Sequence, residues 1–243
     1  MRNYQEELEK RVAFIQKQLQ TAGAQGIVYG NSGGKDSALV GILCRKACDH
    51  VLGVMMPCQS KRNFGEDMVD GLAVAKQFDI ETVTVDLTTA KEALQKNVEA
   101  IMPLADMAKA NMNPRLRMIT LYALAQSRNA LVAGTGNRSE AYMGYFTKWG
   151  DGAYDLNPII DLTVTEIYEF LRFLDAPEAI LTKAPSAGLF EGQTDEQEMG
   201  LTYADLDRYL LTGEGDEAVI AKIEAAHRRS AHKRTMPKVY GGE

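Results

Sequence analysis

The chain has 243 residues, of which 45% are hydrophobic and 25% charged, values typical of a soluble globular protein that needs no disulfide or metal to fold. A formal net charge of −6 argues against a general nucleic-acid binder. No run approaches the roughly 18 apolar residues of a membrane span, and the polar residues 1–10 show no signal-peptide pattern, so we expect a cytoplasmic protein without nucleic-acid or membrane partners.

The chain begins with an expected helix, because Leu8, Val12, Ile15 and Leu19 recur at helical spacing. Short apolar runs then alternate with longer amphipathic stretches. In chain order we expect helix 1–22, strand 26–30, helix 36–48, strand 51–56, helix 66–78, strand 82–87, helices 89–105 and 114–128, strand 131–133, a helix from about 165, and helices 203–211 and 216–231.

This alternation predicts βαβ units and therefore an α/β fold with a doubly wound parallel sheet. We expect about five strands, helices on both faces and a helical C-terminal extension, all within one domain spanning 1–243, because no linker divides the chain. The stretch 137–161 is rich in Gly, Asn, Asp and aromatic residues and is typical of a functional loop. The Gly- and acid-rich segment 184–202 is expected to be a mobile loop.

Three cysteines, Cys44, Cys48 and Cys58, form no C-x-x-C pair. Their spacing indicates reduced, partly buried thiols rather than a metal or disulfide framework.

The strongest local signal lies between the first expected strand and the helix after it. Adjacent glycines let the backbone approach a ligand, and N–H groups that open a helix form a cradle for anions. The two serines add hydroxyl donors, and an aspartate beside phosphate indicates a bridging Mg²⁺. The segment reads Ser32-Gly33-Gly34-Lys35-Asp36-Ser37.

Two commoner motifs do not fit this chain. The Walker pattern fails because Tyr29 and Asp36 stand at positions that it reserves for other residues. The dinucleotide pattern fails because Ser139 replaces its third glycine near Gly134. A plain helix-capping turn explains neither the paired glycines nor the two serines.

Further charged residues stand where ligands are expected. Arg115 and Arg117 lie near a helix start, where a phosphate would offset their unfavourable dipole interaction. Glu140 follows the end of the fourth strand, at the edge where open α/β sheets bind ligands. The tail 227–238 holds five Lys or Arg and no acid, which indicates a local anion site in an acidic chain.

The S-G-G-x-D-S loop resembles the pyrophosphate-binding loop of the N-type ATP pyrophosphatases. Segments around 113–118, 134–140, 144–158, 183–203 and 227–234 resemble, in order, those of the ammonia-dependent NAD synthetases. That resemblance implies ATP-dependent amidation of deamido-NAD with ammonia through an acyl-adenylate, giving NAD, AMP and pyrophosphate. It also implies a homodimer whose acceptor site lies at the subunit interface.

By the same resemblance, site roles fall on particular positions. The ATP site comprises Gly30, Asn31, Ser32, Gly33, Gly34, Lys35, Asp36, Ser37, Thr135 and Ser186. Asp36 and Glu140 would hold Mg²⁺ and, with Lys148, be catalytic. Deamido-NAD would bind Arg115, Lys148, Asp155, His232 and Lys233. For the acids of 194–203 a solvated loop face is the simpler interpretation.

The chain departs from the family pattern at Val164, where relatives commonly carry a lysine that contacts ATP. Two other functions remain open at this point. One is another ATP-pyrophosphatase ligase, either GMP-synthetase-like or tRNA-modifying, and the other is a non-catalytic nucleotide-binding protein of the same fold. No glutaminase domain is evident, so free ammonia or a separate amidotransferase is expected as the nitrogen source.

Overall fold

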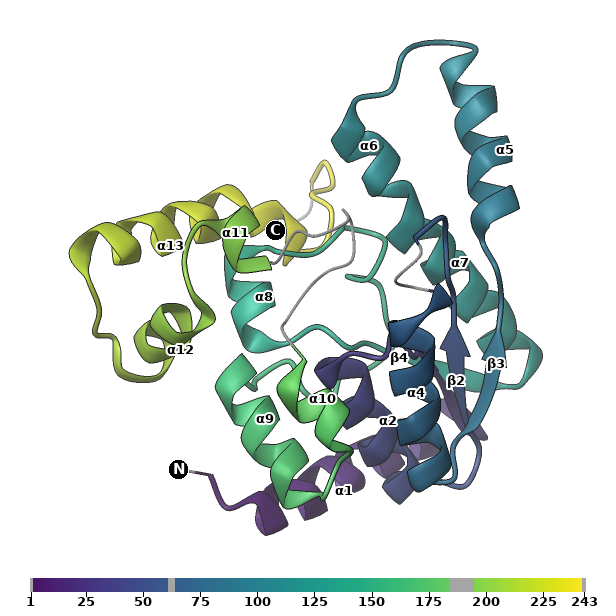
Figure 1. The fold of residues 1–243 in the computed structure, drawn as a ribbon, viewed down its shortest axis with the longest axis vertical. Helices are drawn as coiled ribbons and strands as arrows, with labels where there is room; N and C mark the ends of the chain where they lie inside the picture. Colours follow the sequence, from purple (N-terminus) through teal and green to yellow (C-terminus); the bar gives the residue numbers. More distant parts are fainter. Residues whose placement is uncertain (1, 61–63, 184–194, 242–243) are drawn as a thin grey trace.

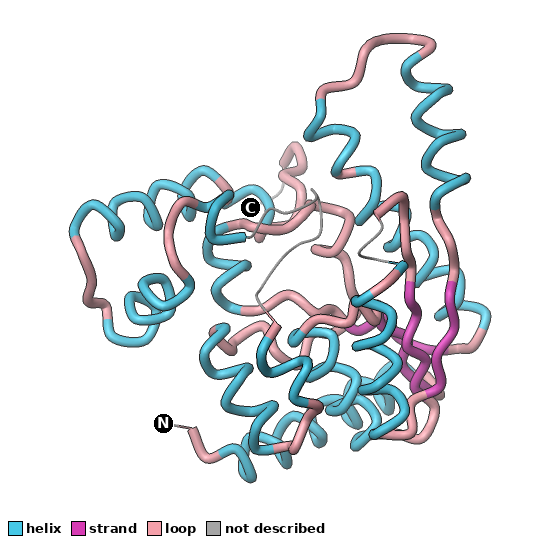
Figure 2. Tube along the Cα trace, viewed as in Figure 1, coloured by secondary structure: helices cyan, strands magenta, loops and turns pink. Residues whose placement is uncertain are grey.

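A computed structural model describes residues 2–60, 64–183 and 195–241. One parallel sheet has the strand order β3-β2-β1-β4 (Figures 1 and 2). Its strands are β1 (Gly26–Gly30), β2 (Val51–Met55), β3 (Glu81–Thr84) and β4 (Ala130–Ala133). The described helices are α1 (Tyr4–Ala22), α2 (Lys35–Ala47), α4 (Glu66–Gln77), α5 (Thr88–Glu99), α6 (Asp106–Ala110), α7 (Met112–Ser127), α8 (Arg138–Met143), α9 (Val164–Phe173), α10 (Glu178–Thr182), α11 (Asp195–Met199), α12 (Tyr203–Thr212), α13 (Glu217–Arg229) and the 3-10 turn η1 (Ala231–Lys233).

Helices cover both faces of the sheet, which confirms the predicted α/β class. Ile27 and Tyr29 point to the face covered by α2 and α4, with α1 and α9 packed outside α2. Val28 points to the opposite face, where it packs with Leu52 and the residues of α7. Because both faces are buried, β1 is apolar throughout instead of alternating with polar residues.

Among the described residues the sheet has four strands, so the expectation of about five was wrong. A single parallel bridge, Ala133 to Leu156, stands where a fifth strand would pair with β4, and Gly134 N donates to Leu156 O at 2.8 Å. Pro158 follows closely, and a proline has no backbone N–H to continue a ladder. The chain therefore touches the sheet edge there and turns away.

The C-terminal helices form a separate layer, as expected. Leu206 of α12, Ile223 of α13 and Met143 of α8 share a small core away from the sheet. Figure 1 shows α12 and α13 projecting to one side, while α5 and α6 project in another direction. No helix in the described ranges has the length and apolar character needed to cross a bilayer. That the whole chain is one domain stays a prediction.

Several expected segments differ in detail. The helix expected at 89–105 ends at Glu99, and α6 begins after a short break. Part of the expected loop 184–202 is the helix α11, and its first residues, 184–194, lie outside the described residues. The short helix α8 was not expected. All three cysteines are free, with Cys44 and Cys58 buried and Cys48 half-buried, as predicted.

The ring of Tyr29 fills a gap between α2 and β2, and its fully buried hydroxyl has no hydrogen-bond partner among the described groups. Gly41 and Gly53 make room for it, since a Cβ at Gly41 would come within 2.3 Å of the hydroxyl oxygen. An unpaired buried hydroxyl opposes folding, so Tyr29→Phe is expected to raise the free energy of unfolding by about 1 kcal/mol.

Urea denaturation followed by circular dichroism measures this effect. The matched control is Tyr4→Phe, because the Tyr4 hydroxyl donates to Glu169 at 2.6 Å and its removal is expected to lower stability. A loss of stability in Tyr29→Phe would mean that the hydroxyl has a partner after all.

Candidate active site

The phosphate-type loop runs from the end of β1 to the start of α2. Gly33 has a φ of 68°, and a Cβ there would lie 2.0 Å from the carbonyl oxygen of Asp67 on α4, so only glycine fits. Asn31, which is 5% exposed, accepts from Gly33 N at 3.3 Å and donates to Gly71 O at 3.1 Å. The loop is therefore held against α4 in a fixed shape.

The two serines of the loop have different positions. Ser32 lines the cleft, and its hydroxyl accepts from Gly34 N at 3.3 Å. Ser37 is buried beneath the loop, where its hydroxyl accepts from Ser32 N at 3.3 Å and donates to Gly34 O at 3.0 Å. Ser37 thus braces the loop, while Ser32 faces the space where a phosphate would lie.

Asn137 binds both predicted metal ligands, Asp36 and Glu140. It was not among the site residues predicted from the sequence. Asn137 is fully buried at the N-cap of α8 and forms a capping box with Glu140. Its side-chain amide donates to Asp36 Oδ1 at 3.0 Å, and its backbone N–H donates to Glu140 Oε2 at 3.1 Å. One residue therefore orients both carboxylates, although they lie far apart in the sequence.

The charges around this pair are strongly coupled. Burial, together with the nearby charge of Asp36, raises the pKa of Glu140 well above its usual range, while Lys35 acts in the opposite direction. Burial lowers the pKa of Lys35, but the charges of Asp36 and Glu140 outweigh it and hold that pKa above its usual value. The protein thus holds two carboxyl groups and one ammonium close together at the wall of the cleft.

These residues fit a magnesium site that is completed by substrate. Asp36 and Glu140 both line the cleft and offer hard carboxylate oxygens, which Mg²⁺ prefers. Within the described residues no three acidic, His or Cys side chains gather closely enough to hold a metal on their own. Phosphate oxygens and water would have to supply the remaining ligands, as is usual for magnesium bound with a nucleotide.

The cleft is about 580 Å³ in volume and has an apolar side. This side lies where β1, β2 and β4 end, next to Gly30 and Thr135. It is lined by Ala133, Met56, Pro57, Met118 and Leu121. Ligands of open α/β sheets bind at this edge. A planar base fits the apolar side, with its phosphates directed at the loop.

Two cationic side chains, Arg117 and Lys233, also line the cleft. Arg117 is half-buried and donates to Met56 O at 3.2 Å, and desolvation lowers its pKa. Lys233 of η1 reaches into the cleft, where its ammonium donates to Gly144 O and Phe146 O, each at 2.7 Å. Burial also lowers the pKa of Lys233. These two cations can bind an anion in the cleft.

The predicted acceptor residues divide into two places. Lys233 lines the cleft, whereas a largely exposed cluster lies outside its lining and consists of the exposed Arg115 and His232 and the half-buried Lys148. Lys148 donates to His232 O at 2.7 Å, and Arg115 donates to Lys148 O at 3.3 Å. The exposed cluster is open to a further ligand or a further chain.

Asp155 stabilises the local backbone through hydrogen bonds. Its carboxylate accepts from Val132 N at 2.7 Å and from the hydroxyl of Tyr122 at 3.2 Å, which fixes the segment that touches the edge of β4. It does not line the cleft. Its binding of a substrate ribose stays a prediction, as does the contact assigned to Ser186, which lies outside the described residues.

Two cleft residues were missed or misread from the sequence. Lys183 lies against the loop, where its ammonium contacts Asp67 at 2.8 Å, Asp70 at 2.6 Å and Gly33 O at 3.3 Å. Asp195 was interpreted as part of a solvated loop face, which was wrong. It is 3% exposed and accepts from the hydroxyl of Tyr203 at 3.0 Å.

Asp195 was misread because acids in a Gly-rich stretch look solvated, and only the fold shows the tyrosines that cover this one.

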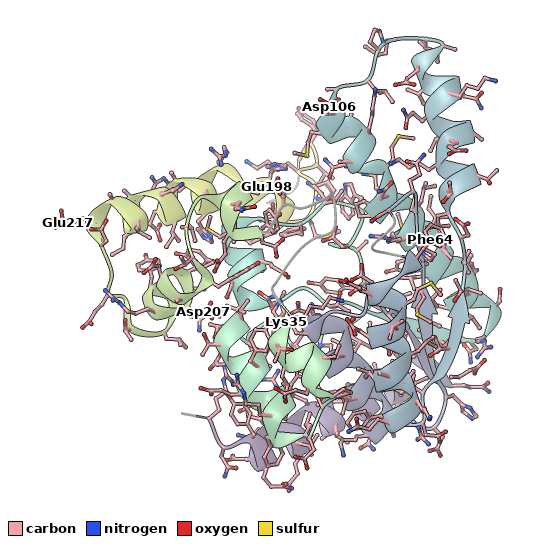
Figure 3. The ribbon with its side chains drawn as sticks, in the orientation of Figure 1. Lys35, Phe64, Asp106, Glu198, Asp207 and Glu217 are labelled. Carbon is pink, nitrogen blue, oxygen red and sulfur yellow. The ribbon has the colours of Figure 1, made fainter. Side chains whose placement is uncertain are left out.

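Glu198, also in the cleft lining, accepts from Tyr145 at 2.6 Å and is labelled with Lys35 in Figure 3. Val164 is buried in the C-terminal core and brings no charge to the cleft.

Comparisons with known proteins agree with this geometry. A family model described as NAD synthase matches residues 7–237. An NH3-dependent NAD+ synthetase of Carboxydothermus hydrogenoformans is 48% identical over 240 residues, which cover 98% of each chain. An NMN synthetase from Francisella tularensis superposes with a TM-score of 0.94 at 37% identity and 100% coverage of both chains. An NH3-dependent NAD synthetase from Campylobacter jejuni superposes with a TM-score of 0.80 at 30% identity, covering 99% of this chain and 100% of the other.

Proposed function

The chain belongs to the NAD synthase family, and from this premise we propose that its cleft binds ATP with Mg²⁺ and activates the carboxylate of deamido-NAD for amidation by ammonia. Family membership makes it a carbon–nitrogen ligase of NAD biosynthesis with ATP as a substrate. A GMP-synthetase-like, tRNA-modifying or non-catalytic function is not favoured, because relatives matched over nearly the whole chain are NAD synthetases.

The reaction has two steps. A carboxylate oxygen of the acceptor attacks the α-phosphorus of ATP, forms an acyl-adenylate and releases pyrophosphate. Ammonia then attacks the acyl carbon, AMP departs with the electron pair of the broken C–O bond, and ammonia loses a proton to give the amide. No side-chain nucleophile is needed, so catalysis depends on positioning and on neutralising phosphate charge.

One observation carries the proposal most strongly: Asn137 holds Asp36 and Glu140 together directly beside the phosphate-type loop. When bound, Mg²⁺ supplies positive charge that stabilises the departing pyrophosphate. The β- and γ-phosphates would bind at the N–H groups of the first turn of α2, where no side chain caps the helix. Arg117 and Lys233, which also line the cleft, would bind the anionic acceptor.

Pyrophosphate release tests this function directly. Purified protein receives ATP, Mg²⁺ and ammonium, with deamido-NAD, with xanthosine monophosphate, or with no acceptor, and NAD is followed by chromatography. We expect release, coupled one-to-one to NAD formation, with deamido-NAD only. Release with xanthosine monophosphate, or with none of the three, contradicts the proposed acceptor.

The Francisella tularensis structure favours a second acceptor, because the protein with a TM-score of 0.94 is an NMN synthetase. The corresponding substrate is nicotinate mononucleotide, which has the same reacting carboxylate but lacks the adenylate half. Adding this mononucleotide to the same assay separates the two. A kcat/KM that is higher for the mononucleotide than for deamido-NAD would assign the chain to mononucleotide amidation.

We also propose that the chain acts as a homodimer. The neighbouring helices α5, α6 and α7 expose large apolar side chains, namely Leu94 of α5, Ile101 and Met102 after it, Met107 of α6 and Ile119 of α7. Exposed apolar groups gathered in this way favour an interface with another chain. A second copy packed on α7 would also approach Arg115, whose side chain is open to the outside.

Ile119→Glu is expected to convert a dimer into a monomer, because a carboxylate cannot be buried unpaired in an apolar contact. The side chain is 58% exposed in the single chain, so the monomer should fold normally. Light scattering after gel filtration measures the mass. The control Leu211→Glu changes a similarly exposed residue of α12 and should leave the mass unchanged. An unchanged mass for Ile119→Glu would place any interface elsewhere.

Ammonia as the nitrogen donor follows the function named for the curated relatives. A cytoplasmic location stays a prediction.

A further inference from the structure

Lys35 is a buried charged residue whose position the proposed reaction does not explain. It is 6% exposed, and its ammonium lies 2.7 Å from Asp36 Oδ2. It also lies 5.8 Å from the ring centre of Tyr203. A lysine in a phosphate loop is expected to reach for phosphate, but here the ammonium is directed at a predicted metal ligand.

Both oxygens of Asp36 are occupied. Asn137 donates to Oδ1 at 3.0 Å, and Lys35 donates to Oδ2 at 2.7 Å. Asn137 is fully buried and anchored in the capping box of α8, so it cannot leave without unfolding that helix start. Lys35 is attached by a long flexible side chain, so its ammonium is the group that can move.

The surroundings of the ammonium are negative or neutral. Asp36 and Glu140 face it from α2 and α8, and Tyr203 of α12 and Tyr168 of α9 lie nearby. Asp195 of α11 contributes further negative charge to Glu140. An ammonium here neutralises carboxylates that would otherwise repel each other, which is also what a divalent cation would do.

A divalent cation and the Lys35 ammonium therefore compete for one side of Asp36. Bringing both cations to the same carboxylate oxygen is opposed by their mutual repulsion. The triphosphate of ATP changes this balance, because its oxygens offer the ammonium a new partner within the same loop.

We propose that Lys35 is a built-in counter-ion that occupies the metal-facing side of Asp36 in the nucleotide-free protein and moves to the phosphates when ATP binds. The metal can then bind well only together with the nucleotide. Lys35 is thus a positioning residue that sets the order of binding. This inference rests on the proposed role of Asp36 and Glu140 in the function above.

Metal binding without nucleotide tests the inference. Mn²⁺ accepts the same oxygen ligands as Mg²⁺ and is visible by electron paramagnetic resonance. Wild-type protein, free of nucleotide, is expected to bind Mn²⁺ weakly. Lys35→Gln and Lys35→Met are each expected to bind it at least about tenfold more tightly, since removal of one adjacent charge has effects of this size. Lys35→Arg, which keeps the charge, should remain weak.

Two comparisons make the result specific. Lys46→Gln removes an exposed lysine at the far end of the same helix and should not change Mn²⁺ affinity. The double variant Lys35→Gln with Asp36→Asn should lose the gain in Mn²⁺ affinity, because it no longer has the Asp36 carboxylate that would bind the metal. ATP without metal, measured by calorimetry in EDTA, should bind Lys35→Gln more weakly than wild type.

Equal Mn²⁺ affinity in wild type, Lys35→Gln and Lys35→Met would overturn the inference, provided that their melting curves show folded protein. If Lys35→Gln does not fold, Lys35→Met decides. The Mn²⁺ measurement needs no acceptor. It can therefore contradict the counter-ion role of Lys35 while the wild-type amidation assay succeeds, or support that role while the amidation assay fails.

Discussion

Asp36→Asn is expected to reduce pyrophosphate release by at least about 10³-fold while leaving the fold intact, because charge stabilisation at a transferring phosphoryl group has effects of this size. The asparagine oxygen can still accept the amide hydrogen of Asn137, which is bound at 3.0 Å in the wild type. The variant therefore removes the charge that would hold Mg²⁺ while preserving the contact that joins α2 to α8.

Steady-state pyrophosphate release with saturating ATP, ammonium and acceptor measures this effect. Asp216→Asn is the control, because Asp216 caps α13 far from the cleft and asparagine caps a helix equally well. The control should keep wild-type turnover. If Asp36→Asn also kept it, the metal role of Asp36 would be wrong, although the ATP site could remain.

The core of the fold could be predicted from the sequence because its strands are buried on both faces. Ile27 and Val28 are adjacent apolar residues that do not alternate with polar ones, and paired glycines occupy the turn after them. Together these two features indicate a βαβ unit. The fifth strand could not be predicted in this way. Leu156 makes one bridge with Ala133, and the pattern of side chains does not reveal how far a backbone pairing extends.

The phosphate-type loop was predictable because its chemistry is local, whereas the rest of the cleft is assembled from distant segments. Asn137 joins Asp36 to Glu140, yet an asparagine before a short helix looks like an ordinary cap. Arg117 and Arg115 are two positions apart on α7, and helix rotation places one in the cleft and the other outside. The spacing separates the two arginines, but it does not show which of them faces the cleft, and it does not show that Asn137 contacts Asp36.

Glu140 connects stability with function through its charge. Burial, and then the charge of Asp36, raises its pKa well above the usual 4.5. The folded state therefore holds this proton more tightly than the unfolded state. As pH rises from about 4.5 through the folded-state pKa, wild-type protein without ligands must ionise the buried carboxyl and loses stability.

Glu140→Gln should remove that loss, since glutamine does not ionise and still accepts the backbone N–H of Asn137. Near neutral pH and without ligands, we expect the variant to be more stable than wild type by about 0.5–2 kcal/mol, as is common when a functional charge is neutralised. Its pyrophosphate release should fall by about 10²-fold or more, because one phosphate-neutralising group is lost.

Added Mg²⁺ and ATP should reverse the order of stability. A ligand at 100 times its dissociation constant stabilises the folded state by about 2.7 kcal/mol, a gain that wild type receives and Glu140→Gln largely lacks. Melting temperatures measured from pH 5 to 8, with and without Mg²⁺ and ATP, give both comparisons. A variant that is less stable without ligands, or that gains as much from Mg²⁺ and ATP as wild type does, would mean that the charge of Glu140 serves the fold and not the bound metal.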